Sequence, residues 1–531
     1  MPPFSRPPQH TPAPPPSGDA PPLPPLGPVR SRFGLDLRSL AAFRIALGIL
    51  LVADALLRCR DFGLMFTPDG MFPHEALLAF QPSVGNWSLA FLVDAAWWDA
   101  VILALEGLAG LWLVVGLQTR LATVVAWVAL VSVVRRTAPA TNAGDLWLTT
   151  LLLWGVFLPL GARWSLDARR QGRAHAAPVH LSIASAALTL QVLVVYLAAG
   201  LAKCNGTWFS GHAVRDALSV HDHGTPLGAW LVGFPGVAAA AGIMVLALEL
   251  AGPAVFLALP HPRIRAAIAA SFILFHALVA LLMTVGLFAL IGIAAWLALL
   301  PSAAWEALGT LAKPAHANTA EPSHDVPDAA RSLPTTGLRA AASIAVQLAC
   351  GCLLVLAVTD ATARLLTQTI QLPGQLQAAI DIACLRQDWE MFGTVPQQEQ
   401  WGYARGVLAD GDEVDLLRGG RPLERERPSG GFTTLPHHRW HKILWELPKP
   451  PMRVFSPSIA RALATNWNRH HGPEEQVQRL EICFTRLTAT TASSQTEPGV
   501  RHELIVASWP PRDARGSGNL DRFLEEHGEG H

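Results

Sequence analysis

Three side chains in long apolar stretches could take part in proton transfer. Lys203 stands where an apolar run ends, within residues 196–208, and Glu249 and His276 lie inside two later apolar runs. A desolvated ammonium group can lose its proton, whereas a guanidinium cannot. Lys and Arg together number 40, only four of them are lysines, and Lys203 is the only lysine in the first 312 residues. Its type therefore indicates a base. The plainer interpretation is a snorkelling anchor at a helix end.

Ionisable groups inside membrane spans are costly and point to function. His276 lies about 16 Å along the axis of its expected helix, near mid-membrane. A neutral imidazole there can complete a core hydrogen bond or bind the polar head of a ligand. No His or carboxylate follows it at the third or fourth position, so no helix-borne metal pair is expected. Glu106 and Glu249 also lie inside their apolar runs. Asp54 and Asp145 have structural interpretations, near an outer helix end and as a helix cap respectively.

The elements around these residues are predicted to span a membrane. Hydrophobic residues make up 51% of the chain and charged residues 15%, which is typical of polytopic membrane proteins. The net charge is zero, and no basic cluster with interleaved aromatics indicates a nucleic-acid surface. The apolar runs at 266–284 and 286–301 are continuous and too long for one span, so we expect a break near Gly286. In the run at 229–259, Gly252-Pro253 predicts a kink. Nine apolar runs approach the length of a span, at 39–57, 99–117, 121–137, 145–162, 181–202, 229–259, 266–284, 286–301 and 338–361.

The distribution of basic residues predicts the orientation. With nine spans and a cytoplasmic N-terminus, 14 Lys and Arg residues fall on the cytoplasmic side and six on the other. The positive-inside rule favours this arrangement. We therefore expect an integral protein of the cell inner membrane with its C-terminal domain outside. Lys203 and Asn142 would lie on the same outer side as that domain.

The predicted fold is a polytopic α-helical membrane protein with about nine transmembrane helices and a small C-terminal β-rich extracytoplasmic domain. The expected parts are a disordered Pro-rich tail (1–34), a transmembrane domain (35–370) with a cytoplasmic linker (302–336), the β-rich domain (371–511) and a flexible tail (512–531). In the β-rich domain, Gly402 to Leu408 and Glu413 to Leu417 indicate a hairpin. Further strands are expected at 439–446, 477–489 and 502–509, and a helix over Ser456 to His470 with Ser456 as a cap. Cys384 and Cys483 could form a bridge in an oxidising compartment.

Several motifs, taken in order, resemble the HTTM domain, the module shared with vitamin K-dependent gamma-carboxylases. The resemblance covers roughly residues 33 to 510. Each motif is short, and their order and spacing carry the resemblance. The motifs are Arg135-Arg136 with Thr141-Asn142-Ala143-Gly144-Asp145, Phe157-Leu158-Pro159, Trp164-Ser165-Leu166-Asp167, Tyr196 to Trp208 with Ser210-Gly211, Glu249-Leu250-Ala251-Gly252-Pro253, Phe275-His276 through Met283, Gly286 and Phe288, and Gln387-Asp388-Trp389-Glu390-Met391-Phe392.

The resemblance implies a nine-span fold with a lumenal β-rich portion and the activity of a carboxylase, which is a lyase. In that chemistry reduced vitamin K, or another quinol, is oxygenated while carbon dioxide is added to glutamate side chains of a peptide or protein. Lys203 would be the catalytic base. His276, Asn142 and Glu249 would belong to the quinone or substrate pocket, without a metal. Oxygen and carbon dioxide would be co-substrates, and the lipid bilayer the surrounding partner.

One departure weakens the expected reaction. The carboxylases carry a histidine just after the position that matches Asn142, and this chain has Ala143 there. The C-terminal domain is also much shorter than in the animal enzymes. The alternative hypothesis is a non-catalytic membrane protein that binds or transports a lipid or small solute. Under that hypothesis Lys203→Arg should be tolerated, and Glu106 and Glu249 would be the sensitive positions.

Overall fold

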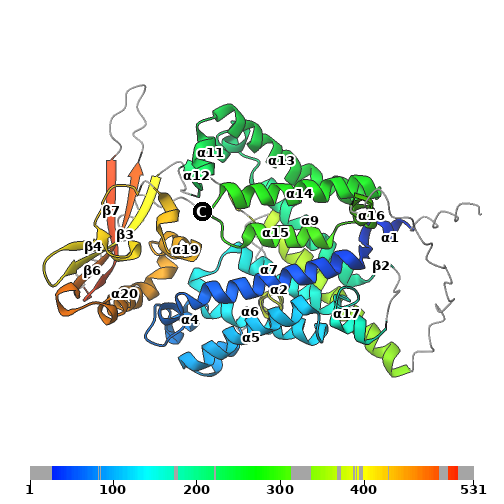
Figure 1. The fold of residues 1–531 in the computed structure, drawn as a ribbon, viewed down its shortest axis with the longest axis horizontal. Helices are drawn as coiled ribbons and strands as arrows, with labels where there is room; N and C mark the ends of the chain where they lie inside the picture. Colours follow the sequence, from blue (N-terminus) through cyan, green and yellow to red (C-terminus); the bar gives the residue numbers. More distant parts are fainter. Residues whose placement is uncertain are drawn as a thin grey trace, which may run out of the picture.

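The computed structural model describes residues 27–81, 83, 85–172, 178–219, 223–311, 337–366, 372–386, 389, 391–393, 399–428, 430–488 and 500–511. In Figure 1 the long helices run side by side across the picture, and the C-terminal domain lies at the left-hand end of this bundle. Within the described residues, six helices are long and apolar enough to cross a membrane. They are α2 (Leu37–Cys59), α5 (Ala96–Val115), α9 (Ile183–Ala202), α13 (Pro235–Ala258), α14 (Pro262–Leu282) and α17 (Gly337–Leu366).

Three further apolar runs also form helices, but shorter ones. They are α6 (Thr119–Arg136), α7 (Ala143–Phe157) and α15 (Phe288–Ala298), with 18, 15 and 11 residues. At 1.5 Å per residue they rise about 27, 22 and 16 Å, against about 30 Å of hydrocarbon. The chain bends by 95° between α15 and α16 (Ser302–Leu311), so this pair forms either a seventh, broken span or a re-entrant loop.

The predicted break near Gly286 is confirmed. Helix α14 ends at Leu282 and α15 begins at Phe288. Gly286 lies between them with φ of +59°, a left-handed conformation that favours glycine. A Cβ atom at this position would lie 2.6 Å from the ring of His438, which belongs to the C-terminal domain. The turn therefore needs glycine both for its backbone conformation and for the close approach of the two domains.

The C-terminal domain contains a five-stranded antiparallel sheet in the order β5-β4-β3-β6-β7. The predicted hairpin is confirmed, since Val407 pairs with Glu413 across its turn. The two later strands also form close to their predicted positions. The strands are β3 (Glu399–Leu408), β4 (Glu413–Asp415), β5 (Arg421–Pro422), β6 (Val477–Thr488) and β7 (Val500–Trp509).

The strand predicted over 439–446 is wrong, because this segment forms helix α19 (His438–Glu446). Its buried side chains, Arg439, Trp440, Ile443 and Leu444, recur with a helical period. The His437 side chain also accepts a hydrogen bond from the Arg439 amide and so caps the helix.

The helix predicted after α19 is confirmed as α20 (Ser456–His470), which packs against β6 and β7. Ser456 is its first residue and not its cap, because Phe455 occupies the N-cap position without a side-chain hydrogen bond. The preceding turn anchors the domain to the bundle. The ring of Phe455 makes edge contacts with Phe72 and Phe80, at centroid distances of 5.6 and 5.3 Å.

The remaining predictions concern tails, a linker and a disulfide. Residues 28–33 of the expected disordered tail form a short helix, α1 (Pro28–Phe33). Helix α16 occupies the first residues of the expected linker. Residues 1–26 of that tail, the linker from 312 to 336 and the tail from 512 lie outside the described residues. The bridge between Cys384 and Cys483 is not formed, since both thiols are free: Cys384 contacts Arg135, and Cys483 is buried in β6.

Candidate functional site

A cavity of about 180 Å³ lies where α9, α13, α14 and the start of α15 meet. Its wall is mostly aliphatic and aromatic. Lys203, Glu249 and His276 all line it, so the structure brings together three of the four residues that the sequence singled out. The other lining residues are Val195, Tyr196, Ala199, Trp208, Val214, Ala217, Leu218, Leu231, Ala241, Val245, Phe275, Leu278, Val279, Leu282, Met283, Val285, Phe288, Trp389, Met391 and Phe392.

Helix α9 presents Tyr196, Ala199 and Lys203 to the cavity because residues three, four and seven apart share a helix face. Lys203 is the C-cap residue of this helix. Gly200 allows α9 to lie close to α13. A Cβ atom there would lie 3.0 to 3.1 Å from Leu250 and Glu249 side-chain atoms. The small residue therefore permits the approach that lets Lys203 reach Glu249.

Lys203 and Glu249 form a buried ion pair. The Lys203 Nζ lies 2.9 Å from the Glu249 Oε2, and only about 5% of either side chain is exposed. Nζ also donates to the carbonyl oxygen of Ala199 at 3.3 Å and lies 5.4 Å from the centre of the Trp208 ring. Pro253 lies four residues after Glu249 in α13. Because proline has no N–H, the Glu249 carbonyl oxygen does not accept the usual helical hydrogen bond from it. One carboxylate and one ammonium thus face each other at the wall of an apolar cavity.

His276 and Tyr196 form a second polar pair on the same cavity. The Tyr196 hydroxyl lies 2.6 Å from the His276 Nε2, and both side chains are buried. Gly292 on α15 makes room for the imidazole, since a Cβ atom there would lie 2.3 to 2.5 Å from the ring. The other ring nitrogen, Nδ1, is buried without a hydrogen-bond partner among the described residues.

A loop of the C-terminal region covers the cavity beside Lys203. The Trp208 indole donates to the carbonyl oxygen of Phe392 at 2.8 Å, and the Asn205 amide donates to that of Gly393 at 2.7 Å. Trp389 packs edge-on against Trp147, with ring centroids 5.9 Å apart. The segment after Lys203 therefore contacts Phe392 and Gly393, and Trp389, Met391 and Phe392 form part of the cavity lining.

Asn142, the fourth predicted site residue, does not line the cavity. Its side-chain oxygen accepts hydrogen bonds from the amides of Gly144 and Asp145, at 2.8 and 3.3 Å. The Asp145 carboxylate in turn accepts from the Asn142 amide at 2.9 Å. This capping box starts α7. The prediction that Asp145 caps the first amides of the helix is wrong, because Asn142 is the cap and Asp145, at the third helical position, accepts from only one backbone amide of the described residues, that of Asn142.

A second buried charge cluster joins the bundle to the C-terminal domain. Arg58 and Arg439 each contact both Asp54 and Asp145, at distances of 2.6 to 3.0 Å. The pKa of Arg439 is above its ordinary value: burial lowers it, but the adjacent Asp145 and Asp54 carboxylates outweigh that effect. Sequence analysis missed Arg439, because a strand prediction hid its place at the start of a helix.

Glu106 is a further buried ionisable residue, and no metal site is found among the described residues. Glu106 on α5 is fully buried, and neither of its carboxyl oxygens makes a hydrogen bond of good geometry to a described residue. In the part of the chain that the structure describes, no group of three or more His, Cys, Asp or Glu side chains could hold a metal ion.

Comparison with known protein families identifies the HTTM domain in this chain. The family model of the HTTM domain matches residues 34–305, just over half of the 531 residues. Lys203, Glu249 and His276 fall within this range. No curated protein and no solved structure matches the chain.

Proposed function

This chain belongs to the HTTM domain family, and from the geometry of its cavity we propose that it is a membrane enzyme acting on a lipid-soluble quinol. The HTTM domain occurs in membrane proteins of the vitamin K-dependent carboxylase type. In this proposal Lys203 removes a proton from the substrate hydroxyl and Glu249 controls the charge on Lys203. Reduced vitamin K is the first substrate to test.

The observation that carries the proposal is the Lys203–Glu249 pair on the wall of an apolar cavity. Charged groups are strongly disfavoured in a low dielectric, and a single proton moved from Nζ to the carboxylate would leave both groups neutral. The resulting amine is a base. When it takes the proton of the substrate hydroxyl, the positive charge on Nζ balances the substrate oxyanion, and loss of the proton held by the carboxylic acid then restores the starting ion pair. Arginine could not do this, because its guanidinium stays protonated.

The cavity also fits an aromatic ring that bears a hydroxyl group. An apolar protein cavity of about 150 Å³ holds benzene, and this cavity measures about 180 Å³. The unpartnered His276 Nδ1 would gain a hydrogen bond from a polar group on such a ring. A quinol supplies a weakly acidic hydroxyl and, when oxidised, two electrons. Trp389 and Phe392 line the same cavity, and Lys203 is buried, which would limit its contact with bulk water.

The proposal includes the topology of nine spans, with the N-terminus cytoplasmic and the C-terminal domain outside the inner membrane. The excess of Lys and Arg on the cytoplasmic side supports this orientation. Of the six basic residues assigned to the outer side, four (Arg58, Arg135, Arg136 and Lys203) are buried. Arg60 and Arg215 alone are exposed in that set.

The test is turnover by the full-length protein in lipid nanodiscs. Wild type should consume reduced vitamin K in the presence of oxygen, and Lys203→Ala and Lys203→Arg should both lose this activity. Arg461→Ala, which changes an exposed residue on α20, is the matched control and should stay active. Equal turnover by Lys203→Arg would overturn the base assignment.

A parallel assay tests carbon dioxide addition. Labelled bicarbonate and a Glu-containing peptide are supplied with reduced vitamin K to wild type and Lys203→Ala. Label in the peptide from wild type alone would extend the proposal to carboxylation. Quinol consumption without label would restrict it to oxidation of the quinol.

The buried Glu106 favours a second candidate function, binding or transport of a small solute or lipid. Intramembrane carboxylates of this kind often line ion or proton paths. Under this alternative Lys203→Arg keeps function, whereas Glu106→Gln and Glu249→Gln abolish solute uptake by proteoliposomes.

A further inference from the structure

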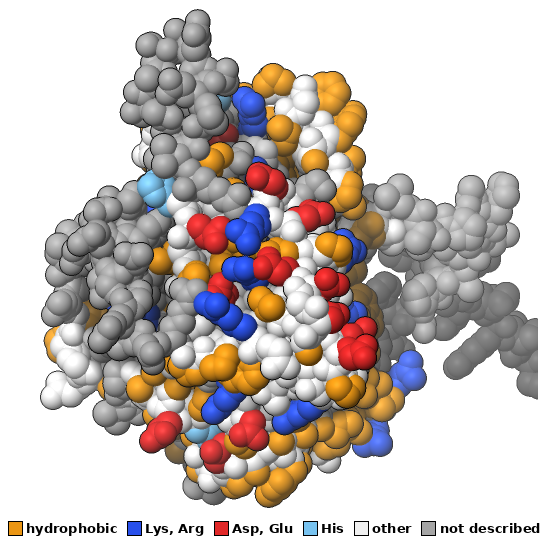
Figure 2. Space-filling view, turned by 90° about the vertical axis from the view of Figure 1, so that its left-hand side faces the viewer, with side chains coloured by type: hydrophobic (Ala, Val, Ile, Leu, Met, Phe, Trp, Pro, Cys, Tyr) orange, Lys and Arg blue, Asp and Glu red, His pale blue; other side chains and the backbone are white. Residues whose placement is uncertain are grey.

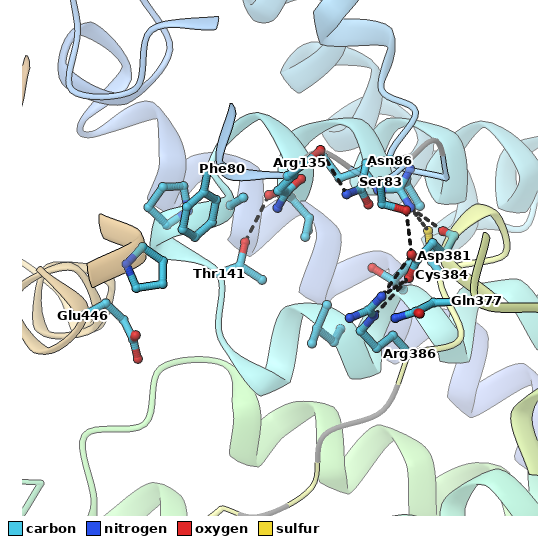
Figure 3. A pocket seen from close by; sticks show the side chains of 18 of the residues that line it. Phe80, Ser83, Asn86, Arg135, Thr141, Gln377, Asp381, Cys384, Arg386 and Glu446 are labelled. Carbon is cyan, nitrogen blue, oxygen red and sulfur yellow. Dashed lines mark hydrogen bonds and ion pairs between the residues drawn. The ribbon is translucent and has the colours of Figure 1, made fainter. Parts of the chain in front are cut away.

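A cleft of about 840 Å³ lies on the other side of the C-terminal domain's contact with the bundle. It shares no lining residue with the Lys203 cavity. Figure 3 shows its side chains converging from the bundle, from α18 (Gly374–Ile382) and from α19. The lining residues are Phe80, Gln81, Ser83, Asn86, Val131, Val134, Arg135, Ala138, Pro139, Thr141, Leu146, Thr149, Gly374, Gln377, Ala378, Asp381, Cys384, Arg386, Lys442, Glu446, Lys449, Pro451 and Met452.

The cleft carries more positive than negative groups. Its charged lining residues are four cations, Arg135, Arg386, Lys442 and Lys449, and two carboxylates, Asp381 and Glu446. Figure 2 shows positive and negative side chains interspersed on the face of the molecule that it presents. Within the cleft itself, cations outnumber carboxylates by four to two.

One excess cation is Arg135, at the inner wall. Its guanidinium donates to the backbone carbonyls of Gly85, Trp87 and Asp381 and to the sulfur of Cys384. Among the described residues, no carboxylate forms an ion pair with it. The Asp381 carboxylate is occupied by Arg386, through two hydrogen bonds of 2.9 and 3.0 Å, and by the Ser83 hydroxyl at 2.8 Å.

The second excess cation lies at the rim, where two lysines share one carboxylate oxygen. Lys442 and Lys449 lie 2.8 and 3.0 Å from the Glu446 Oε1. Their side chains are 37% and 50% exposed, so either ammonium can turn toward a ligand. The pKa of Glu446 is below its ordinary value: burial raises it, but the two ammonium groups outweigh that effect. Near neutral pH one positive charge therefore remains without a partner.

The bundle also contributes apolar side chains to the lining of the cleft. Val131 and Val134 come from the last turns of α6 and Leu146 from the first turns of α7. A charged rim together with apolar lining residues at the ends of bundle helices matches an anionic amphiphile, because the head can contact ammonium groups while the tail contacts apolar side chains such as the half-buried Leu146. We propose that this cleft binds the phosphate head group of an anionic phospholipid.

The test measures thermal unfolding of the purified full-length protein in a nonionic detergent, followed by tryptophan fluorescence. A ligand that binds the native state raises the Tm as its concentration increases. Dihexanoyl phosphatidylglycerol should raise the Tm of wild type, and the zwitterionic dihexanoyl phosphatidylcholine should not. Inorganic phosphate alone separates a free-anion site, which it would also stabilise, from a site that needs the lipid tail.

Variants connect the shift to the cleft. Lys442→Gln/Lys449→Gln should need about 30-fold more phosphatidylglycerol for the same shift, since each lysine near an anionic head contributes roughly a fivefold factor. Glu446→Gln should need less lipid than wild type, because it releases both ammonium groups. Arg479→Gln, an exposed cation on β6, is the matched control and should behave as wild type.

Equal stabilisation by phosphatidylcholine, or an unchanged response of the double lysine variant, would overturn the proposal. A shift with hexaglutamate and none with phosphatidylglycerol would identify a peptide site and also overturn it. None of these measurements depends on turnover, so failure here leaves the proposed reaction at Lys203 standing.

Discussion

Two groups of buried charges, one at the junction of the bundle with the C-terminal domain and one inside the bundle, differ in residue type and surroundings. The first contains Asp54, Arg58, Asp145 and Arg439, in which two guanidinium groups bridge two carboxylates at 2.6 to 3.0 Å. The second contains Lys203 and Glu249, a single pair beside a cavity. Arginine stands where charge is fixed between packed elements. Lysine, which is rare in this chain, stands where a ligand could exchange a proton.

The difference follows from the chemistry of the two side chains. A guanidinium presents several donors in a rigid plane and keeps its proton, so it can hold two carboxylates at once. An ammonium is a compact group whose proton affinity responds to its surroundings. Substitutions in the first group should therefore affect stability, and substitutions in the second should affect turnover.

Removal of Arg439 should have the largest effect on stability. Arg439→Leu leaves Asp54 and Asp145 buried with one arginine between them, and breaking such a buried network costs about 3–5 kcal/mol. We expect a lower Tm and easier proteolysis at the junction between the bundle and the sheet domain. Thermal unfolding and limited proteolysis measure both effects.

The control for this change is Arg461→Leu on α20, where the side chain is exposed. We expect its free energy of unfolding to fall by less than about 0.5 kcal/mol. Equal stability of Arg439→Leu and wild type would show that the cluster does not hold the two domains together. The arginine cluster would then not be a group of charges that stabilises the fold.

Glu249→Gln should have the next largest effect, on turnover. Glutamine can accept a hydrogen bond from Lys203 but cannot take its proton, so the amine can no longer form by exchange within the pair. We expect the rate of quinol consumption to fall by about 10², with little change in Tm. Asp145→Asn is the informative partner variant, because it should lower the Tm instead. A normal rate in Glu249→Gln would mean that Lys203 loses its proton by another route.

An acid-dependent loss of stability should come from His438, which precedes Arg439 and packs against Gly286. Burial, followed by the nearby Arg439 charge, lowers the pKa of His438 to about 4. The ordinary histidine pKa is about 6.5, so the unfolded chain binds more protons between these values. Stability should therefore fall as the pH drops through that window, by about 1–3 kcal/mol at pH 4.

This contribution can be isolated by subtraction. His438→Gln has no titrating ring, so its free energy of unfolding should change less than that of wild type between pH 7 and about pH 4.5. Parallel curves for the two proteins over this range would show that the ring is not held neutral in the native state.

Sequence patterns identified the cavity better than the junction between the domains. Lys203, Glu249 and His276 stand out because each is ionisable within an apolar run, and the helical period brings each to one face. Arg439 gave no such signal. It lies in a polar segment that alternates like a strand, and its role depends on contacts with residues nearly 300 and 400 positions earlier. Gly200 and Gly292 were equally hidden, because their importance comes from the neighbouring helix and not from their own sequence.

Tyr196→Phe should have the smallest effect, and it tests whether the polar pair on the cavity resembles the fixed or the exchangeable group. The change removes the hydroxyl that lies 2.6 Å from the His276 Nε2, leaving a buried ring nitrogen without this partner. A lost hydrogen bond of this kind costs about 1–2 kcal/mol. If the pair only positions the imidazole, the Tm should fall by a few degrees while the pH dependence of turnover stays that of wild type. Titration of turnover with pH in both proteins measures this, and a shifted profile would place His276 with the proton-exchanging residues.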